Sequence, residues 1–452
     1  MTADLANKKI LVVGLKRSGV ALSKFLVSRK ASVVVADMAD EEKLAPFISG
    51  IKDLGITLEL GVHRNETFET ADLVILSPGV PHTIEPVRRA VANKVPVVGE
   101  MEFAFGFISE PIVAVTGTNG KTTTTELIGA ILRHSGKKPF VGGNIGNPLI
   151  EYVDQTEKAD VVVAEVSSFQ LDTIVNFRPC VGILLNITDD HLNRYDGFEG
   201  YVASKARLFL NQKAGDTAVL SKKDPVVRSL VNRIKSRVLN FDGDGDERAG
   251  AIILKNEIII RLDGKEDSSI DCSGLDLPGR HNLENISAAS LGALAAGGTV
   301  EGIRSALKQF RGLPHRLEYI CERNGVRFYD DSKATNVDAV RKAIETFDAR
   351  IVIIMGGRDK GGDFQSLKDG LRRRAKKLIV MGEAREIIST AFKGIIPMEP
   401  ARDMEEAVFL AYQAAEAGDV VLLSPGCASF DMFDGYARRG EAFQSAARKI
   451  KA

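Results

Sequence analysis

The feature that most constrains this chain is a glycine-rich loop between an apolar run and an amphipathic pattern. In AVTGTNGKTTTTELIGAIL the loop spans residues 117–122. Strand, loop and helix in this order let backbone N–H groups and a helix N-terminus surround a phosphate. Lys121 is then placed to reach the β and γ phosphates, and Thr122 to ligate Mg²⁺. The loop therefore predicts a nucleoside triphosphate site in an α/β domain.

The loop departs from the usual G-x-x-x-x-G-K-[ST] spacing in one respect. Val115 stands where the first glycine is expected. A chance glycine-rich turn is the alternative interpretation. The flanking strand and helix patterns favour nucleotide binding.

Length and alternating patterns predict an α/β protein of three domains. The chain has 452 residues, 44% hydrophobic and 27% charged, which is an ordinary globular composition too long for one usual core. Short β-branched runs alternate with helical patterns in three series. We expect an N-terminal Rossmann-like domain over 1–99, a central ATP-binding domain with a parallel or mixed sheet over 100–312, and a C-terminal Rossmann-like domain over 313–452.

Charge and hydropathy exclude several classes of protein. Lys plus Arg and Asp plus Glu number 60 each, so no global field attracts nucleic acid or an anionic membrane. The four cysteines form no CxxC pair, which argues against a zinc cluster or a disulfide framework. The start of the chain is not typical of a secretory signal, and no run of about 18 apolar residues follows. We expect a cytoplasmic monomer whose partners are small molecules.

Acidic residues follow two further apolar runs, where ligand sites of open α/β sheets gather. Glu165 ends ADVVVAE, and Asp189, Asp190 and His191 come just after VGILLN. Each acidic residue alone could equally be a helix cap or a turn residue. Together with the phosphate loop they predict a second set of Mg²⁺ ligands. Lys205 lies in GYVASKARLFL, where periodicity alone predicts a solvated surface side chain.

Eight motifs follow one another along the chain: GTNGKTT, EVSSFQL, NITDDHLNRY, LPGRHNLEN, LPHRLE, DDSKATN, GGRDKGGDF and SPGCASFDMF. In this order they resemble the Mur ligases, over essentially the whole chain. SSFQL, DSKATN and GGRDKGGDF are similar to the members that add D-glutamate to UDP-N-acetylmuramoyl-L-alanine, and no DNPR-like motif for diaminopimelate is present. The resemblance implies a three-domain, ATP-dependent, amide-forming ligase of peptidoglycan precursor synthesis. It also implies that the domain over 1–99 binds UDP and that the domain over 313–452 binds the incoming amino acid.

The resemblance also implies roles for individual residues. Two Mg²⁺ ions would be held by Thr122, Glu165, His191 and Lys205, the last carbamylated by CO₂ so that a cation becomes a carboxylate. Asn144 and Lys333 would lie near an acyl phosphate and complete the catalytic set with Lys121, Glu165, His191 and Lys205. The implied ATP site, with the asparagines near adenine and the aspartate at ribose, consists of Gly117, Thr118, Asn119, Gly120, Lys121, Thr122, Thr123, Asn282, Asn285, Arg316 and Asp331.

Two further sites are expected for the substrates that are joined. The loop from Gly14 to Gly19 departs from the dinucleotide pattern G-x-G-x-x-G, and we expect its amides to face the UDP diphosphate, with Asp37 near uracil. The expected UDP-substrate site consists of Gly14, Leu15, Lys16, Ser18, Gly19, Asp37, Ser77, Pro78 and Gly79. The resemblance implies that Lys360, Ser429 and Tyr436 hold the two carboxylates of D-glutamate; the family often has phenylalanine at the last position.

The expected chemistry begins with activation of a carboxylate, because a carboxylate and an amine do not condense usefully in water. Transfer of the γ-phosphoryl group of ATP gives an acyl phosphate, which the amine of D-glutamate attacks to form a tetrahedral intermediate. His191, a substrate carboxylate and a phosphate oxygen stay open as the general base. Because the substrates approach from three domains, domain closure is predicted.

Other functions compete with this prediction. A folylpolyglutamate synthase should begin close to its phosphate loop, whereas about a hundred residues precede Gly117 here. A different Mur ligase would carry another amino-acid motif. A P-loop switch ATPase would leave DDSKATN and SPGCAS unexplained, and an NAD-dependent oxidoreductase would leave the central P-loop unexplained.

Overall fold

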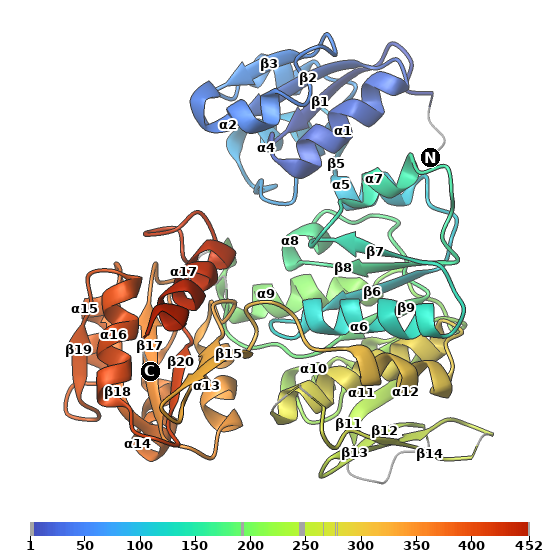
Figure 1. The fold of residues 1–452 in the computed structure, drawn as a ribbon. Coiled ribbons are helices and arrows are strands. Elements are labelled where there is room, and N and C mark those ends of the chain that lie inside the picture. The colour runs from blue at the N-terminus through green and yellow to red at the C-terminus, as the bar shows by residue number, and fades with distance from the viewer. Residues whose placement is uncertain are drawn as a thin grey trace.

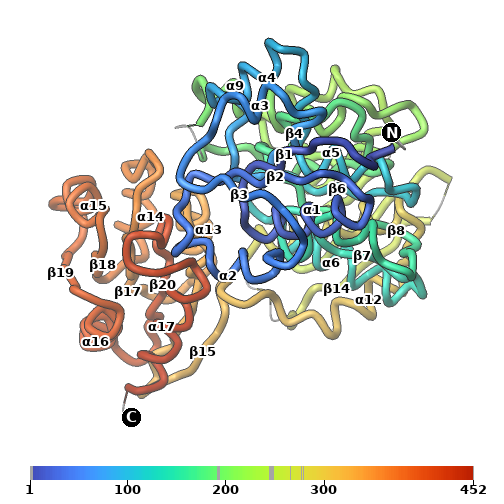
Figure 2. Tube along the Cα trace, turned by 90° about the horizontal axis from the view of Figure 1, so that it is seen from above, coloured from blue at the N-terminus to red at the C-terminus, as the bar shows by residue number. Residues whose placement is uncertain are grey.

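The computed structural model describes residues 4–190, 194–243, 249–264, 266–275, 277 and 279–450. Within these residues the strands form three sheets that follow one another along the chain (Figure 1). Figure 2 shows the C-terminal part, in orange and red, as a lobe beside the other two. The predicted α/β class with three sheets is confirmed. The residue boundaries of the three predicted domains stay a prediction.

The first sheet has five parallel strands in the order β3-β2-β1-β4-β5. Its β-branched runs are buried in their middles because helices cover the sheet. The strands are β1 Lys9–Val13, β2 Ser32–Asp37, β3 Thr57–Leu60, β4 Leu73–Leu76 and β5 Val97–Gly99. The helices are α1 Arg17–Ser28, α2 Glu41–Ile48, α3 Asn65–Glu69 and α4 Glu85–Ala92. The small parallel sheet expected here is confirmed.

The middle sheet has nine strands in the order β14-β13-β12-β11-β10-β9-β6-β8-β7. It is parallel from β7 to β12 and ends in an antiparallel meander, which includes the hairpin expected near AIILKNEIII. The strands are β6 Ile112–Thr116, β7 Pro139–Gly143, β8 Val161–Glu165, β9 Val181–Leu184, β10 Thr217–Ser221, β11 Arg237–Gly243, β12 Gly250–Leu254, β13 Glu257–Arg261 and β14 Ser268–Asp271. The α-helices are α5 Glu100–Phe105, α6 Lys121–His134, α7 Leu149–Val153, α8 Ser168–Leu171, α9 Gly197–Ala206, α10 Pro225–Ser229, α11 Arg280–Ala295 and α12 Val300–Gln309. Among the described residues, η2 Arg207–Phe209 and η3 Val231–Arg233 are 3₁₀ helices.

The third sheet has six strands in the order β15-β16-β20-β17-β18-β19, of which only β15 is antiparallel to its neighbour. The strands are β15 Glu318–Arg323, β16 Val326–Asp330, β17 Ile351–Gly356, β18 Ala375–Met381, β19 Met398–Pro400 and β20 Val420–Leu423. The helices are α13 Val337–Thr346, α14 Lys368–Arg374, α15 Arg385–Ala391, α16 Met404–Ala414 and α17 Tyr436–Lys449, with the 3₁₀ helix η4 Phe364–Leu367.

The two junctions between the sheets differ in chemistry. One hydrophobic cluster runs from Phe25 of the first unit through Met101 and Ala104 of α5 into the middle unit. The C-terminal unit instead has two clusters of its own. The first junction is therefore apolar and continuous, whereas polar side chains and cavities lie between the middle and C-terminal units.

Candidate active site

The phosphate loop is shaped by its two glycines and braced by an asparagine from the neighbouring strand. Gly117 and Gly120 have φ values of 150° and 87°. A Cβ at Gly120 would lie 2.2 Å from Oδ1 of Asn285, so a side chain there would have to displace the Asn285 side chain, besides adopting a positive φ. The Asn119 N–H donates to Oδ1 of Asn186 (2.9 Å), and Nδ2 of Asn186 donates to the Asn119 carbonyl (3.1 Å). The loop is thus fixed against the segment that follows β9.

Lys121 begins α6 and folds back over the loop. Its Nζ donates to the carbonyls of Gly117 (2.9 Å) and Thr118 (2.8 Å). Burial lowers the pKa of Lys121, and the nearby carboxylates of Glu165 and Asp190 oppose that effect. Lys121, Glu165 and Asp190 therefore interact electrostatically at the carboxyl edge of the middle sheet.

Glu165 ends β8 with one carboxylate oxygen paired and the other unpaired. Nδ2 of Asn144 donates to Oε1 (2.8 Å). Oε2 is buried and has no hydrogen-bond partner among the residues that the structure describes. An orphaned buried carboxylate oxygen is costly unless a cation or a ligand satisfies it. The pair of Glu165 and Asn144 therefore fits a metal site beside the phosphate loop.

Lys205 corrects one expectation. Periodicity alone predicted a solvated surface side chain, but Lys205 is 1% exposed. Its Nζ donates to the Gly117 carbonyl (2.9 Å) and lies 4.7 Å from the centre of the Tyr201 ring. Burial, and then repulsion by Lys121, lower the pKa of Lys205 well below its usual value. The prediction failed because Lys205 lies on the buried face of α9, one turn after Tyr201, where a charged side chain is rarely found.

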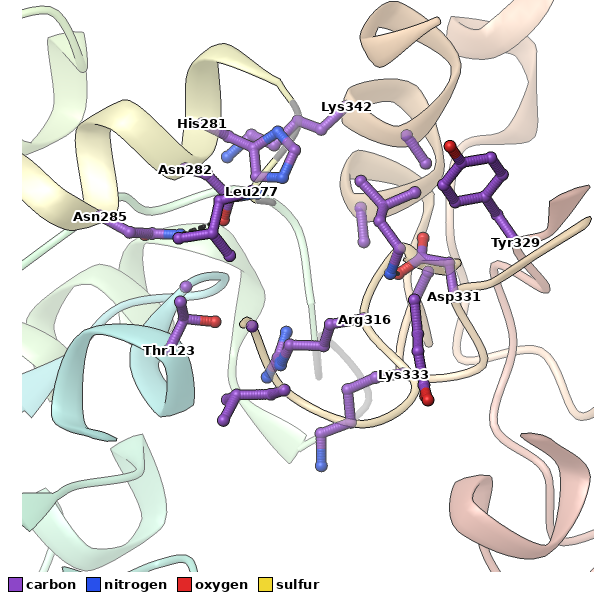
Figure 3. A pocket seen from close by; sticks show the side chains of 18 of the residues that line it. Thr123, Leu277, His281, Asn282, Asn285, Arg316, Tyr329, Asp331, Lys333 and Lys342 are labelled. Carbon is purple, nitrogen blue, oxygen red and sulfur yellow. Dashed lines mark hydrogen bonds between the residues drawn. The ribbon is translucent and has the colours of Figure 1, made fainter. Parts of the chain in front are cut away.

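A cavity of about 750 Å³ adjoins the phosphate loop and opens between the middle and C-terminal units. In Figure 3, Thr123, Asn282 and Asn285 approach it from the middle unit, and Asp331 and Lys333 from the other side. Arg316 lies between the two sides (Figure 3). The structure therefore brings together the residues expected to form an adenine nucleotide site.

A strained segment carries Arg316 into this cavity. The residues on either side, His315 and Leu317, both have positive φ values, 63° and 46°. The His315 ring is held by Asp330 (Nδ1 to Oδ2, 2.7 Å), and the Leu317 N–H donates to Oδ1 of Asp331 (3.3 Å). Nη2 of Arg316 then donates to the Thr122 hydroxyl at 3.0 Å. The segment links the C-terminal unit to the phosphate loop.

Two further titratable groups face the cavity. Burial raises the pKa of Asp331 to about 7, although its Oδ2 accepts the Ser424 hydroxyl at 2.9 Å. Burial, and then repulsion by Arg316, lower the pKa of Lys333 to about 7. The Lys333 ammonium lies 3.5 Å from the centre of the Tyr436 ring, a cation–π contact. Lys333 thus lies between the nucleotide cavity and Tyr436.

Further polar contacts join the phosphate-loop side to the C-terminal unit. Nδ2 of Asn119 donates to Oδ2 of Asp338 (2.8 Å), and Nδ2 of Asn336 donates to Oδ1 of Asn119 (3.2 Å). Nδ2 of Asn336 also lies 3.3 Å from Oδ2 of Asp190. Nζ of Lys360 lies 3.8 Å from the other oxygen of Asp190.

The residues expected at D-glutamate lie on this same side. The loop that carries Lys360 pairs with the loop before Ser429 through reciprocal hydrogen bonds of Arg358 and Ala428 (2.8 and 3.0 Å). Ser429 is buried, and Tyr436 begins α17 under the Lys333 ammonium. The loops of Lys360 and Ser429 are therefore adjacent, and Lys360 faces Asp190 of the middle unit.

The expected UDP-binding residues lie at the carboxyl edge of the first sheet. A Cβ at Gly19 would lie 2.0 Å from the Gly14 carbonyl, so this approach requires glycine. The Ser77 hydroxyl donates to that carbonyl at 2.8 Å. Asp37 accepts the N–H groups of Leu15 (2.7 Å) and Ala39 (2.9 Å), so its carboxylate already braces the loop. Lys16 lies in the loop after β1, Ser18 in the first turn of α1, and Pro78 and Gly79 in the loop after β4.

Sequence reasoning missed several residues at these sites. His281 and Lys342 also line the cavity, and burial lowers the pKa of His281 to about 4. Arg194 donates to the Gly79 carbonyl at 3.2 Å and stacks on Phe169 at 3.9 Å. His281 and Arg194 lie inside quoted motifs, which could have indicated them. His191 lies outside the described residues.

Three family profiles match successive parts of the chain. They are described as the MurD-like N-terminal domain of Mur ligases (residues 8–99), the Mur ligase middle domain (115–293) and the Mur ligase glutamate ligase domain (315–427). The chain belongs to the Mur ligase family. Among its relatives, the UDP-N-acetylmuramoylalanine–D-glutamate ligase of Desulfosudis oleivorans is 48% identical over 99% of this chain and 98% of its own. The protein of the same description from Desulfatibacillum aliphaticivorans is 50% identical over 97% and 98%.

Solved structures support the Mur ligase fold. A pseudomurein peptide ligase type C from Methanothermus fervidus has a TM-score of 0.64 at 20% identity and covers 98% of this chain and 100% of its own. A MurF ligase from Thermotoga maritima in complex with ADP has a TM-score of 0.63 at 19% identity and covers 99% of both chains. Among the described helices, none is both long and apolar enough to cross a membrane.

Proposed function

We propose that this Mur ligase joins D-glutamate to UDP-N-acetylmuramoyl-L-alanine, with conversion of ATP to ADP and phosphate, in peptidoglycan precursor synthesis. The full-length identity to D-glutamate ligases supports the choice of member. One observation carries the chemistry: Asp190 pairs with Lys360 of the C-terminal unit and acts electrostatically on Lys121 of the phosphate loop. An activated carboxylate and an incoming amino acid can meet at such a junction.

ATP is proposed to occupy the cavity between the middle and C-terminal units. The loop amides and Lys121 would bind its phosphates, and Asn282 and Asn285 would contact the base. Asp331 would accept a ribose hydroxyl. Arg316 would reach the phosphates through its position on Thr122. Because the two walls of this site belong to different units, the site is complete only when the units approach each other. This arrangement favours domain movement during the catalytic cycle.

Two Mg²⁺ ions are proposed to bind beside the phosphate loop, and the orphaned Oε2 of Glu165 supports a cation there. The Thr122 hydroxyl would hold the first, and the orphaned Oε2 of Glu165, His191 and a carbamylated Lys205 would hold the second. When bound, the ions offset the repulsion between the attacking carboxylate and the triphosphate. Lys121 contributes to the same neutralisation, while Asn144 keeps the Glu165 carboxylate oriented.

Carbamylation is proposed for Lys205 on chemical grounds. Its lowered pKa favours the neutral amine, whose nitrogen can attack CO₂ and release one proton to give a carbamate anion. The product replaces a buried positive charge, repelled by Lys121, with a negative charge beside it. This change turns an electrostatic cost into an attraction and supplies a further oxygen ligand.

The transfer itself follows from these positions. The L-alanyl carboxylate takes the γ-phosphoryl group near Lys121, Asn144 and Lys333, and the amine of D-glutamate then displaces phosphate through a tetrahedral intermediate. Lys360, Ser429 and Tyr436 would hold D-glutamate, and the loops at Gly14, Lys16, Ser18, Gly19, Asp37 and Ser77–Gly79 would hold the UDP moiety. Since both ATP and the UDP-sugar are cytoplasmic metabolites, a cytoplasmic location is proposed; a monomer suffices, because one chain supplies every group.

Phosphate release measured with ATP, Mg²⁺, UDP-N-acetylmuramoyl-L-alanine and single amino acids tests the proposal. Release that requires both the UDP substrate and D-glutamate is expected. Release with L-lysine or diaminopimelate on a longer UDP-peptide would agree with a Mur ligase but would refute the assignment of D-glutamate as its amino acid. Release indifferent to every substrate would favour a switch ATPase instead.

A further inference from the structure

An ion pair between Asp190 and Lys360 spans the junction between the middle and C-terminal units beside the phosphate loop. Oδ1 of Asp190 and Nζ of Lys360 lie 3.8 Å apart, and the two side chains are only 9% and 26% exposed. Asp190 follows β9, whereas Lys360 lies on a loop after β17. Each unit therefore contributes one charge.

The orientation of Asp190 is set from the other side. Nδ2 of Asn336 contacts its Oδ2 at 3.3 Å, so the two carboxylate oxygens face different partners. Asn336 is itself fixed, because its Oδ1 caps α13 by accepting the Ala339 N–H (2.9 Å) and its Nδ2 donates to Asn119 of the phosphate loop (3.2 Å). Oδ1 is thereby directed at Lys360.

Separating such a pair without replacement is unfavourable. Each partly buried charge would lose one nearby opposite charge, and removal of one partner from a buried pair is destabilising. An amino acid is a zwitterion, so it can supply an ammonium to the carboxylate and a carboxylate to the ammonium at once. A dicarboxylic acid without the amine supplies only negative charge, which Asp190 repels.

We propose that D-glutamate enters this ion pair, with its α-ammonium on Asp190 and one of its carboxylates on Lys360. This inference rests on the proposed function and adds Asp190 to it as the residue that recognises the amine. Asp190 also acts electrostatically on Lys121 and Lys205, so an amine held there lies next to the phosphate loop, where the acyl phosphate forms. The pair thereby selects amino acids and positions the nucleophilic nitrogen.

Equilibrium calorimetry tests the inference with enzyme saturated by UDP-N-acetylmuramoyl-L-alanine and a non-hydrolysable ATP analogue. Two ligands are compared: D-glutamate and (R)-2-hydroxyglutarate, which replaces the ammonium by a hydroxyl. In the wild type the hydroxy acid should bind roughly 10- to 100-fold more weakly, the range expected for one charge-assisted hydrogen bond. Equal affinity in the wild type would overturn the inference, whatever any variant does.

Two variants test the roles of the two charges separately. In Asp190→Asn the ratio of the two affinities should fall towards one. In Lys360→Met both ligands should weaken while the ratio stays near the wild-type value. An undiminished ratio in a folded Asp190→Asn variant would refute the role of Asp190. If wild-type enzyme neither binds D-glutamate nor releases phosphate with it, the proposed function fails instead.

Discussion

Glu100 makes the stability of the first junction depend on pH. It begins α5 directly after the last strand of the first sheet and is 1% exposed. Its Oε1 accepts the Ile150 N–H at 2.9 Å, whereas its Oε2 is buried and has no partner among the described atoms. Burial raises the pKa of Glu100 from 4.5 to about 7.

The sign and size of the effect follow from proton linkage. Below pH 4.5 Glu100 is protonated in both the folded and the unfolded chain. Between pH 4.5 and about 7 the folded chain keeps a proton that the unfolded chain releases, so the free energy of unfolding falls as the pH rises. At about 1.4 kcal/mol per pH unit, a gap of about 2.5 units corresponds to about 3 kcal/mol of stability lost by pH 8.

Glu100→Gln mimics the protonated side chain at every pH and should remove this loss. Scanning calorimetry at pH 5 and pH 8 should show the variant gaining about 3 kcal/mol on the wild type at the higher pH, or roughly 6–12 °C in the Tm of a transition of 150–250 residues. Glu41→Gln, a change at an exposed glutamate, is the control and should follow the wild type. Parallel profiles for wild type and Glu100→Gln would refute the reasoning.

Three catalytic-site variants give further expected outcomes. Lys121→Ala should abolish ATP turnover, yet calorimetry should show that the variant still binds the UDP substrate. If circular dichroism shows that the variant is unfolded, the two sites are not independent. Lys205→Ala should lose phosphate release and recover part of it when short carboxylic acids are added. No recovery would contradict the carbamate and leave Lys205 a positioning role only. Arg316→Met removes one charge-assisted hydrogen bond to Thr122 and should raise the KM for ATP roughly 10- to 100-fold. Arg402→Met, at an 84% exposed side chain, should leave it unchanged, and an equal rise in both variants would contradict the assignment.

Local sequence patterns were enough to predict the helices and strands and the phosphate loop. The β-branched runs around Val34, Val163 and Ile353 became central strands, and glycine at 117 and 120 meets backbone angles that few other residues adopt. These features depend on neighbours in the chain. A sequence therefore reveals them directly.

Helical periodicity gave a wrong prediction of burial where segments distant in the sequence pack against a side chain. Lys205 looks like a surface residue of α9, but the phosphate loop of β6 and α6 covers its amine. Asp190 and Lys360 are far apart in the sequence and belong to different units, so no local pattern could pair them. The same holds for Arg316 on Thr122.

The sequence by itself determined the class of fold, the nucleotide loop and, through its motifs, the family, because each depends on residue types at short spacing. Only the tertiary structure decided which charges share a neighbourhood, which carboxylate oxygen lacks a partner and how the C-terminal unit meets the phosphate loop. Electrostatic energies depend on distance and burial, and both are set by the docking of whole domains. The reactive centre is therefore a property of the junction between two domains.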